Sequence, residues 1–272
     1  MRSGALRVRA SRGTLPRVLT TLEEAPTLSL VRFVDQVKLL APNEGRVRHE
    51  FLPDGRTSLV FRVLDNGRRG DVSVAGPCTR MRIKEPRGVV RALIVEFKPG
   101  WSTSLLGVAA HELTDRIVPL DEIWGCAGAD LYARLVEARD VPEQIECVSR
   151  AIARRLQRST ESSSAGLARR AVRLLQGGEV RVDRVAARLG ITARHLRRAF
   201  TENVGVGPKE YARSVRLRRA LRLAATSRDW GRIALDAGYY DQAHLIADFR
   251  QLVGVTPGAF VRHARAADVR CV

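Results

Sequence analysis

Three arginines, Arg194, Arg197 and Arg198, lie within five residues of one another. A guanidinium group donates two parallel hydrogen bonds to a phosphate or to guanine O6 and N7, and the guanine contact supplies about 1 to 3 kcal/mol of base discrimination. Leu196 and Phe200 recur at helical spacing, so a helix here has its apolar side opposite the arginines. The pattern predicts a basic helix face suited to nucleic acid; a solvated face with no partner is the alternative interpretation.

The segment around these arginines has a second copy further along the chain. Val185 corresponds to Ile233, 48 positions later, and Gly190 corresponds to Gly238. In each copy a short apolar helical pattern ends at the glycine, where a left-handed residue closes a helix. Such self-similarity indicates one supersecondary unit that is used twice.

Each copy continues with a residue that favours the start of a second helix, Thr192 in the first and Asp241 in the second. Two helices joined by a short turn with a glycine are typical of the helix-turn-helix, whose second helix enters the DNA major groove. We expect these units at residues 182–204 and 230–253. Between them, residues 209–225 have an apolar and a basic side, which predicts one connecting helix of about 25 Å.

The outward positions of the second unit differ from those of the first. Beside the three arginines, Thr201 completes the expected DNA-contacting set of the first unit. In the second unit we expect Gln242 to pair with adenine, Ile246 to meet a thymine methyl group, and Arg250 to contact DNA. Asp248 adds a negative charge that phosphates would repel. The first unit is therefore expected to carry most of the hydrogen-bonded sequence reading.

The order and spacing of these residues closely resemble the AraC/XylS-type transcriptional regulators, over residues 167–265. The matching stretches are Val185–Phe200, Gly205–Tyr211, Arg216–Ala220, Ile233–Ala234, Gly238, His244–Leu245, Phe249 and Gly254–Pro257. The resemblance implies a cytoplasmic, sequence-specific regulator of transcription that binds double-stranded DNA. It also implies base or phosphate contacts from Arg194, Arg197 and Arg198. In the second unit Ala247 replaces an arginine that is usual in the family, which puts that contact in doubt.

The charge of the chain agrees with a nucleic-acid partner. The formal net charge is +18, and residues 165–272 contain 21 Lys and Arg against 9 Asp and Glu. Clustered arginine is the electrostatic footprint of nucleic-acid binding, although a GC-rich genome also produces arginine-rich proteins. No apolar run approaches the roughly 18 residues of a membrane span, so we expect no membrane partner.

Residues 46–100 contain short apolar runs separated by turn residues such as Asp54-Gly55 and Asn66-Gly67, which are strong hairpin signals. The expected strands include 47–52, 57–64, 72–75 and 89–97, and helices are expected at 101–106, 121–124, 127–138 and 142–157. The fold class is therefore α+β with two domains: a small N-terminal β-barrel or sheet with helices, and an all-α tandem helix-turn-helix.

Several stretches resemble the uncharacterised cupin-like sensor domain of some AraC/XylS-type regulators. These stretches are Leu52–Gly55, Gly76–Pro77, Phe97–Gly100, Leu105–Val108, Glu112–Arg116 and Pro119–Gly125. The resemblance implies a regulatory domain over residues 1–158 that responds to a small-molecule effector of unknown identity. A serine-rich linker is expected at 159–166, and the DNA-binding domain at 167–265, with its first helix starting near Leu167.

Neither catalysis nor a metal is expected. A metal-dependent cupin needs several converging His and Glu side chains, and only His49 and His111 are available in the N-terminal region. His195 and His244 occupy equivalent positions near the start of the second helix of each unit, where a core or capping role is expected. The four cysteines show no Cys-x-x-Cys pair, so neither a disulfide framework nor a zinc knuckle is indicated, and no cofactor is expected.

Two other functions are the alternatives. Some DNA repair methyltransferases carry the same DNA-binding module and sacrifice a cysteine, but none of the four cysteines here has a metal-binding or Pro-Cys-His-type context, so the sequence argues against repair. An architectural protein would bind DNA without sequence preference. RNA polymerase and a second copy of the chain are further candidate partners. Residues 142–157 place an apolar face on one helix, made of Ile145, Val148, Ile152 and Leu156, which suits either a homodimer or packing on the N-terminal domain.

Overall fold

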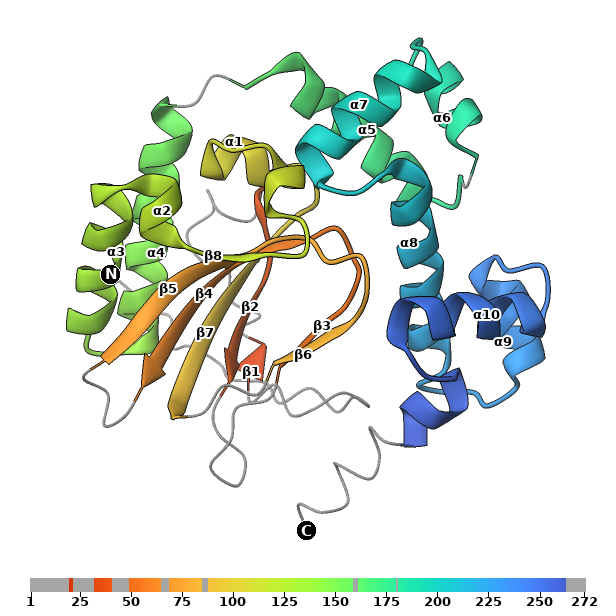
Figure 1. The fold of residues 1–272 in the computed structure, drawn as a ribbon, viewed down its shortest axis with the longest axis horizontal. Helices are drawn as coiled ribbons and strands as arrows, with labels where there is room; N and C mark the ends of the chain where they lie inside the picture. The colour runs from red at the N-terminus through yellow and green to blue at the C-terminus, as the bar shows by residue number, and fades with distance from the viewer. Residues whose placement is uncertain are drawn as a thin grey trace, which may run out of the picture.

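The computed structural model describes residues 20–21, 32–40, 49–64, 69–84, 88–158, 161–179 and 181–262. An N-terminal sheet with helices precedes a C-terminal helical region (Figure 1), which is the expected two-domain α+β fold. The first 19 residues, positions 159–160 of the expected linker, and the end of the expected DNA-binding domain at 263–265 lie outside the described residues. None of the described helices is long and apolar enough to cross a membrane.

The N-terminal sheet has six strands in the order β1-β2-β7-β4-β5-β8, and neighbouring strands are antiparallel. These strands are β1 (Thr20–Thr21), β2 (Val34–Leu40), β4 (Thr57–Leu64), β5 (Arg69–Ala75), β7 (Val89–Phe97) and β8 (Ile117–Pro119). A separate two-stranded ladder joins β3 (His49–Phe51) to β6 (Arg82–Lys84). Of the two architectures expected, the described strands form an open sheet with β1 and β8 at its edges.

The central strands β4 and β7 are apolar on both faces. Val60 lies opposite Ile94, and Phe61 lies opposite Leu93, with all four side chains buried. Continuous β-branched and aromatic runs suit a strand that is covered on both sides. Both strands begin and end at the residues expected from the sequence.

Five helices accompany this sheet in the described part of the chain, and α3 and α4 lie beside β5 in Figure 1. They are α1 (Ser102–Leu106), the 3-10 helix η2 (Ala110–Leu113), α2 (Leu120–Trp124), α3 (Cys126–Glu137) and α4 (Val141–Arg158). The apolar face of α4 packs on its own domain, because Val148 and Ile152 are buried in the main cluster of the sheet. That face is therefore not a free dimer surface.

The C-terminal region contains six full helices. They are α5 (Ser163–Gln176), α6 (Val182–Arg188), α7 (Ala193–Val204), α8 (Pro208–Leu223), α9 (Trp230–Ala237) and α10 (Gln242–Val253). Residues 257–262 add a further helical segment. Helix α5 starts four residues before the expected Leu167, because the Ser162 side chain accepts the Ala165 N–H at 3.2 Å. A serine run that suggests flexibility by its composition thus provides an N-cap.

Candidate nucleic-acid interface

The first helix-turn-helix unit consists of α6 and α7. Gly190 adopts φ 70° in the turn between them, and the hydroxyl of Thr192 accepts a hydrogen bond from the N–H of His195 at 3.2 Å. Helix α7 therefore begins after Thr192, as expected, and it ends at the left-handed Gly205. These local features hold the arginine-bearing helix at a fixed angle to α6.

The predicted contact residues of the first unit lie on one side of α7. Arg194, Arg197 and Arg198 are exposed and Thr201 is half-buried, whereas Leu196 is fully buried on the opposite side. The side chains therefore have the orientation that the periodicity predicts. The arrangement gives the N-terminal half of α7 a dense positive charge that is open to solvent.

The second unit repeats this geometry with α9 and α10. Gly238 adopts φ 88°, and the Asp241 carboxylate accepts the N–H of His244 at 2.7 Å. On α10, Gln242 and Arg250 are exposed and Ile246 is half-buried. The structure thus places the three predicted residues on the outer side of the helix, as in the first unit.

Asp248 does not lie on that outer side, so the expected repulsion of phosphates is wrong. Its side chain is 8% exposed and forms ion pairs with Arg213 at 2.6 Å and Arg216 at 3.6 Å, both on α8. The repeat itself contains the signal that identifies this position. Leu196 corresponds to Leu245, so Asp248 corresponds to Ala199, which is buried in the first unit. Arg213 and Arg216, which belong to the basic side of α8, are therefore paired with Asp248.

The two equivalent histidines are both exposed, so the expected core role is wrong for them. The Nδ1 atom of His244 accepts the N–H of Tyr240 at 3.4 Å, and its ring packs edge-on against Tyr239 at 5.3 Å. This is a capping role. Among the residues that the structure describes, no group of three or more His, Cys, Asp or Glu side chains could hold a metal ion.

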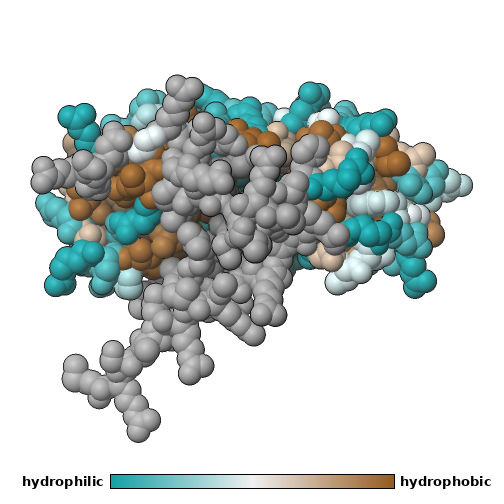
Figure 2. All heavy atoms as spheres, turned by 90° about the horizontal axis from the view of Figure 1, so that it is seen from below, coloured by the Kyte–Doolittle hydropathy of each residue, from teal (hydrophilic) through white to brown (hydrophobic). Residues whose placement is uncertain are grey.

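Helix α8 connects the two units and lies between them in Figure 1. It contains 16 residues, which correspond to about 24 Å of helix. The first unit packs on it through Tyr211 and the second through Leu217. Figure 2, which views the molecule from below, shows hydrophilic side chains projecting at the right, where the helix-turn-helix region lies.

The N-terminal domain contacts the C-terminal end of α7, a feature that the sequence did not predict. The hydroxyls of Ser102 and Thr103 donate to the carbonyls of Asn203 at 3.3 Å and Glu202 at 3.0 Å. The Thr114 hydroxyl donates to the carbonyl of Gly205 at 2.7 Å. The last carbonyls of a helix have no partner within the helix, so the N-terminal domain supplies one.

The N-terminal domain also reaches the second unit, because the N–H of Met81 donates to the Leu252 carbonyl at the end of α10 at 2.7 Å. The reading helices, α7 of the first unit and α10 of the second, are therefore both held at their C-terminal ends by the N-terminal domain. Arg194 and Gln242 lie at the opposite, N-terminal ends of these helices.

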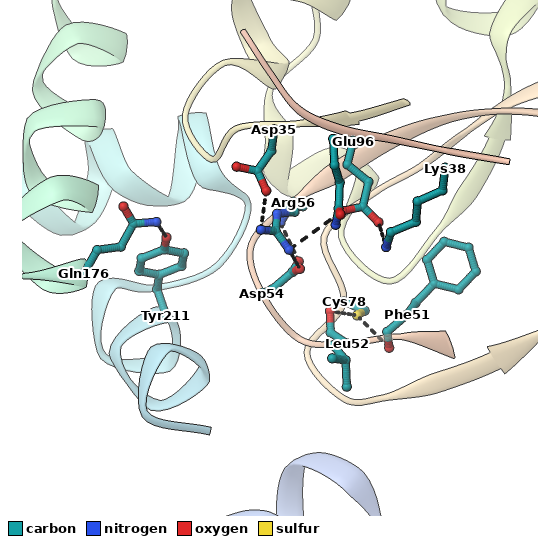
Figure 3. Close-up of polar contacts among 11 residues, drawn as sticks. Asp35, Lys38, Phe51, Leu52, Asp54, Arg56, Cys78, Glu96, Gln176 and Tyr211 are labelled. Atoms are coloured by element: carbon teal, nitrogen blue, oxygen red, sulfur yellow. Dashed lines mark hydrogen bonds and ion pairs between the residues drawn. The ribbon is translucent and has the colours of Figure 1, made fainter. Parts of the chain in front are cut away.

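In a third contact between the two domains, the turn before β4 packs against Tyr211 of α8. A Cβ atom at Gly55 would lie 2.8 Å from the Tyr211 ring, so only glycine allows this close approach. Arg56 anchors the same turn through ion pairs with Asp54 at 2.6 Å and with Asp35 (Figure 3). On the other side, Gln176 of α5 donates to the Tyr211 hydroxyl at 2.8 Å.

The buried Cys78 is poorly suited to nucleophilic chemistry. The Cys78 thiol is buried and donates to the Leu52 carbonyl at 3.1 Å, and burial raises its pKa to about 12. A thiol needs a low pKa and access to solvent to attack an alkyl group. Cys126 is exposed and Cys147 half-buried, both distant in sequence from the helix-turn-helix units, and Cys271 lies outside the described residues.

Two helix-turn-helix units on one connecting helix define a helix-turn-helix DNA-binding domain. Comparison with known proteins agrees: residues 185–263 match a helix-turn-helix domain family. Residues 22–119 match a domain of unknown function, DUF6597, whose description names no ligand or activity. The chain thus carries an AraC-type helix-turn-helix domain behind an N-terminal domain of the DUF6597 type.

A curated relative supports the assignment of the C-terminal domain. The chain is 40% identical over 86 residues to the HTH-type transcriptional regulator GlxA of Rhizobium meliloti (strain 1021). This match covers 30% of the chain and 26% of GlxA, so the chain spans about a quarter of the length of that relative. The match therefore concerns only a part of each protein.

Two solved structures show distant likenesses. ToxT from Vibrio cholerae O395 is 10% identical with a TM-score of 0.44, over 84% of this chain and 96% of that chain. A DNA-binding transcriptional dual regulator from Escherichia coli K-12 is 20% identical with a TM-score of 0.34, over 39% of this chain and 99% of that chain. Both TM-scores are below 0.5, so the likenesses are distant.

Proposed function

We propose that this protein is a sequence-specific, DNA-binding regulator of transcription that acts in the cytoplasm. The observation that carries the proposal is the tandem pair of helix-turn-helix units on one helix, each with the outer face of its second helix open to solvent. In this arrangement α7 and α10 read adjacent major-groove segments of one duplex.

The first unit supplies most of the base reading in this proposal. Arg194, Arg197 and Arg198 donate to guanine or to phosphate, and Thr201 contacts the backbone or a base edge. In the second unit Gln242 pairs with adenine and Ile246 packs on a thymine methyl group. Arg250, at the position equivalent to Thr201, contacts phosphate.

The N-terminal domain is the regulatory part. The support for this role is the set of hydrogen bonds from Ser102, Thr103, Thr114 and Met81 to the C-terminal ends of both reading helices. A small-molecule effector that shifts this domain would shift both helices. RNA polymerase and a second copy of the chain are further proposed partners, the latter through a surface other than the packed face of α4.

The test is selection of bound sequences from random duplexes by the full chain, followed by affinity measurements on the selected duplex. Arg194→Ala and Arg197→Ala should each cost about 1 to 3 kcal/mol and relax base preference at one or two positions. Lys209→Ala, directed at phosphate, should weaken all duplexes evenly. Arg134→Ala on α3, also an exposed arginine, is the matched control and should change neither property.

The alternatives predict other outcomes. Equal affinity for selected and random duplexes at physiological salt would identify an architectural DNA binder. A methyl adduct on a cysteine after incubation with methylated DNA would identify a repair enzyme. The raised pKa of Cys78 and the matches described above give the repair function no support.

A further inference from the structure

A cleft of about 1110 Å³ lies between the N-terminal domain and the first helix-turn-helix unit. Arg32, Lys98 and Trp101 line it from the N-terminal domain, helix α5 lines it from the other side, and Ile191 and His195 extend it to the first unit. Part of this boundary is visible in Figure 3, where Asp35 and Arg56 lie on one side and Gln176 on the other.

Positive charge dominates this cleft. Its cationic side chains come from both domains: Arg32, Arg56, Lys98, Arg169, Arg170 and Arg173. Among the described residues, the one carboxylate in the lining is Asp35, which is paired with Arg56; Arg56 also pairs with Asp54 and Glu96. A neighbouring carboxylate, Glu161, is shared between Arg169 and Arg32.

Arg170 and Arg173 have no carboxylate partner within the described part of the chain. Both belong to α5, about two and about three turns from its start, and they lie three residues apart on the same helix face. Two guanidinium groups at this spacing can hold one multiply charged anion between them. The cleft therefore has donors that its own residues do not satisfy.

Among the cationic side chains of the cleft, Arg169 is closely surrounded by its neighbours. Its guanidinium lies 3.7 Å from the centre of the Trp101 ring, and its side chain is 11% exposed. Burial, and then the charges of Arg32 and Arg173, lower the pKa of Arg169. Arginine stays protonated in proteins, so Arg169 keeps its charge although burial disfavours it; Arg32 adds repulsion from the N-terminal domain, and Arg173 adds repulsion from the same helix.

We propose that this cleft binds a small anion with two or more phosphate groups, and that the bound anion tightens the N-terminal domain onto the first helix-turn-helix unit. Phosphate oxygens match the planar donor fork of arginine. A monocarboxylate would neutralise less of this charge, and polar and charged side chains outnumber the apolar residues of the lining, which are Pro99, Trp101, Leu167, Val172 and Ile191. Binding of the anion is independent of the proposed regulatory function, whereas its effect on DNA rests on that function.

The binding test uses the full chain without DNA and inorganic tripolyphosphate as the probe, followed by calorimetry at constant ionic strength. Arg170→Gln combined with Arg173→Gln should weaken binding by about tenfold or more, because two charged donors are lost. The control is Arg154→Gln combined with Arg158→Gln, which removes the same charge from exposed arginines of α4. This control should change the affinity by less than about twofold.

Two outcomes would overturn the binding step. If both double variants lose the same affinity, tripolyphosphate binds diffusely to a basic protein. If oleate binds the cleft in a manner that depends on Arg170 and Arg173 while tripolyphosphate does not, the ligand class is wrong. Orthophosphate should bind more weakly than pyrophosphate, and pyrophosphate more weakly than tripolyphosphate.

A second arm separates a free phosphate compound from the phosphates of DNA. Without tripolyphosphate, the α5 double variant should bind the selected duplex within about twofold of the wild type. A loss like that of Lys209→Ala would assign the cleft to the DNA backbone and overturn the proposal. If no duplex is selected at all, the proposed function fails, yet the calorimetric result still decides whether the cleft binds phosphate.

Discussion

The two helix-turn-helix units have the same interior and different surfaces. In both, a leucine and a phenylalanine of the second helix are fully buried: Leu196 and Phe200 in the first, Leu245 and Phe249 in the second. The outer faces do not correspond, because Arg194, Arg197 and Arg198 align with Ala243, Ile246 and Ala247. Packing fixes which residues a unit can bury, whereas the exposed face is free to specialise.

The inner contacts also differ between the units. Asp248 connects the second unit to α8 by ion pairs, while its counterpart in the first unit is the buried Ala199. At its C-terminal end, the first reading helix accepts three hydroxyl hydrogen bonds from the N-terminal domain, and the second accepts one from a backbone N–H. The first unit is thus more closely tied to the N-terminal domain, and the second to the connecting helix.

The largest expected effect is a loss of stability when the core of one helix-turn-helix unit is disrupted at a time. Phe200→Ala and Phe249→Ala should each lower the free energy of unfolding by about 3 to 5 kcal/mol, because each empties the centre of one core. Urea unfolding measures the total loss, and hydrogen exchange shows which helix loses protection. Leu235→Ala, at a side chain that is 64% exposed, is the control. Equal loss of protection in α7 and α10 for either variant would mean that the units unfold together.

The next effect concerns the ion pairs that join the second unit to α8. Asp248→Asn should lower the free energy of unfolding by about 2 kcal/mol, because Arg213 and Arg216 lose their anionic partner. Asp236→Asn, at an exposed i,i+4 pair with Arg232, should cost less than about 0.5 kcal/mol. Gel shifts provide a second readout. A gain in DNA affinity for Asp248→Asn with unchanged stability would show that this carboxylate faces phosphate after all.

A smaller effect is expected at the domain contact. Thr114→Val removes the hydrogen bond to the Gly205 carbonyl and should cost about 1 kcal/mol of stability. Hydrogen exchange should show faster opening at the end of α7 and no change at the end of α10. Thr226→Val, whose hydroxyl bonds only to the nearby Leu223 carbonyl, is the control. Faster exchange at both helix ends would show that the two contacts open as one.

The smallest effect concerns the reading face of the second unit. Gln242→Ala should cost less than about 1 kcal/mol of DNA affinity and should relax preference at a single adenine, below the expected cost of Arg194→Ala. Affinities for the selected duplex and for single-base variants of it give the measurement. A cost equal to that of Arg194→Ala would show that the two units share the base reading evenly.

Local periodicity predicted much of this fold. Strands β4 and β7 were predicted at their observed ends, because each is a mainly apolar run with turn residues beside it. Strand β2 was missed, since Asp35, Gln36 and Lys38 interrupt its apolar residues and its polar side chains pair with Arg56 and Glu96 only in the folded sheet. The N-caps at Thr192 and Asp241 were predicted because a cap depends on neighbours three residues away.

The contacts between the domains could not be predicted in this way. The hydroxyls that reach α7 come from residues 91 to 101 positions earlier in the chain. Serine and threonine occur in many surface positions, so nothing in their pattern marks Ser102 or Thr114 as interfacial. The position of Asp248 was within reach of the sequence, because alignment of the two repeats places it opposite the buried Ala199.

The hydrogen bonds at the C-terminal ends of the reading helices have a mechanical consequence. Helix α7 contains 12 residues, so the carbonyls held by the N-terminal domain lie about 18 Å along a stiff rod from Thr192. A small tilt at the held end swings the arginine-bearing end through an arc. In the proposed regulatory role, a shift of the N-terminal domain would therefore change the angle at which α7 enters the groove, while the proposed DNA surface stays uncovered.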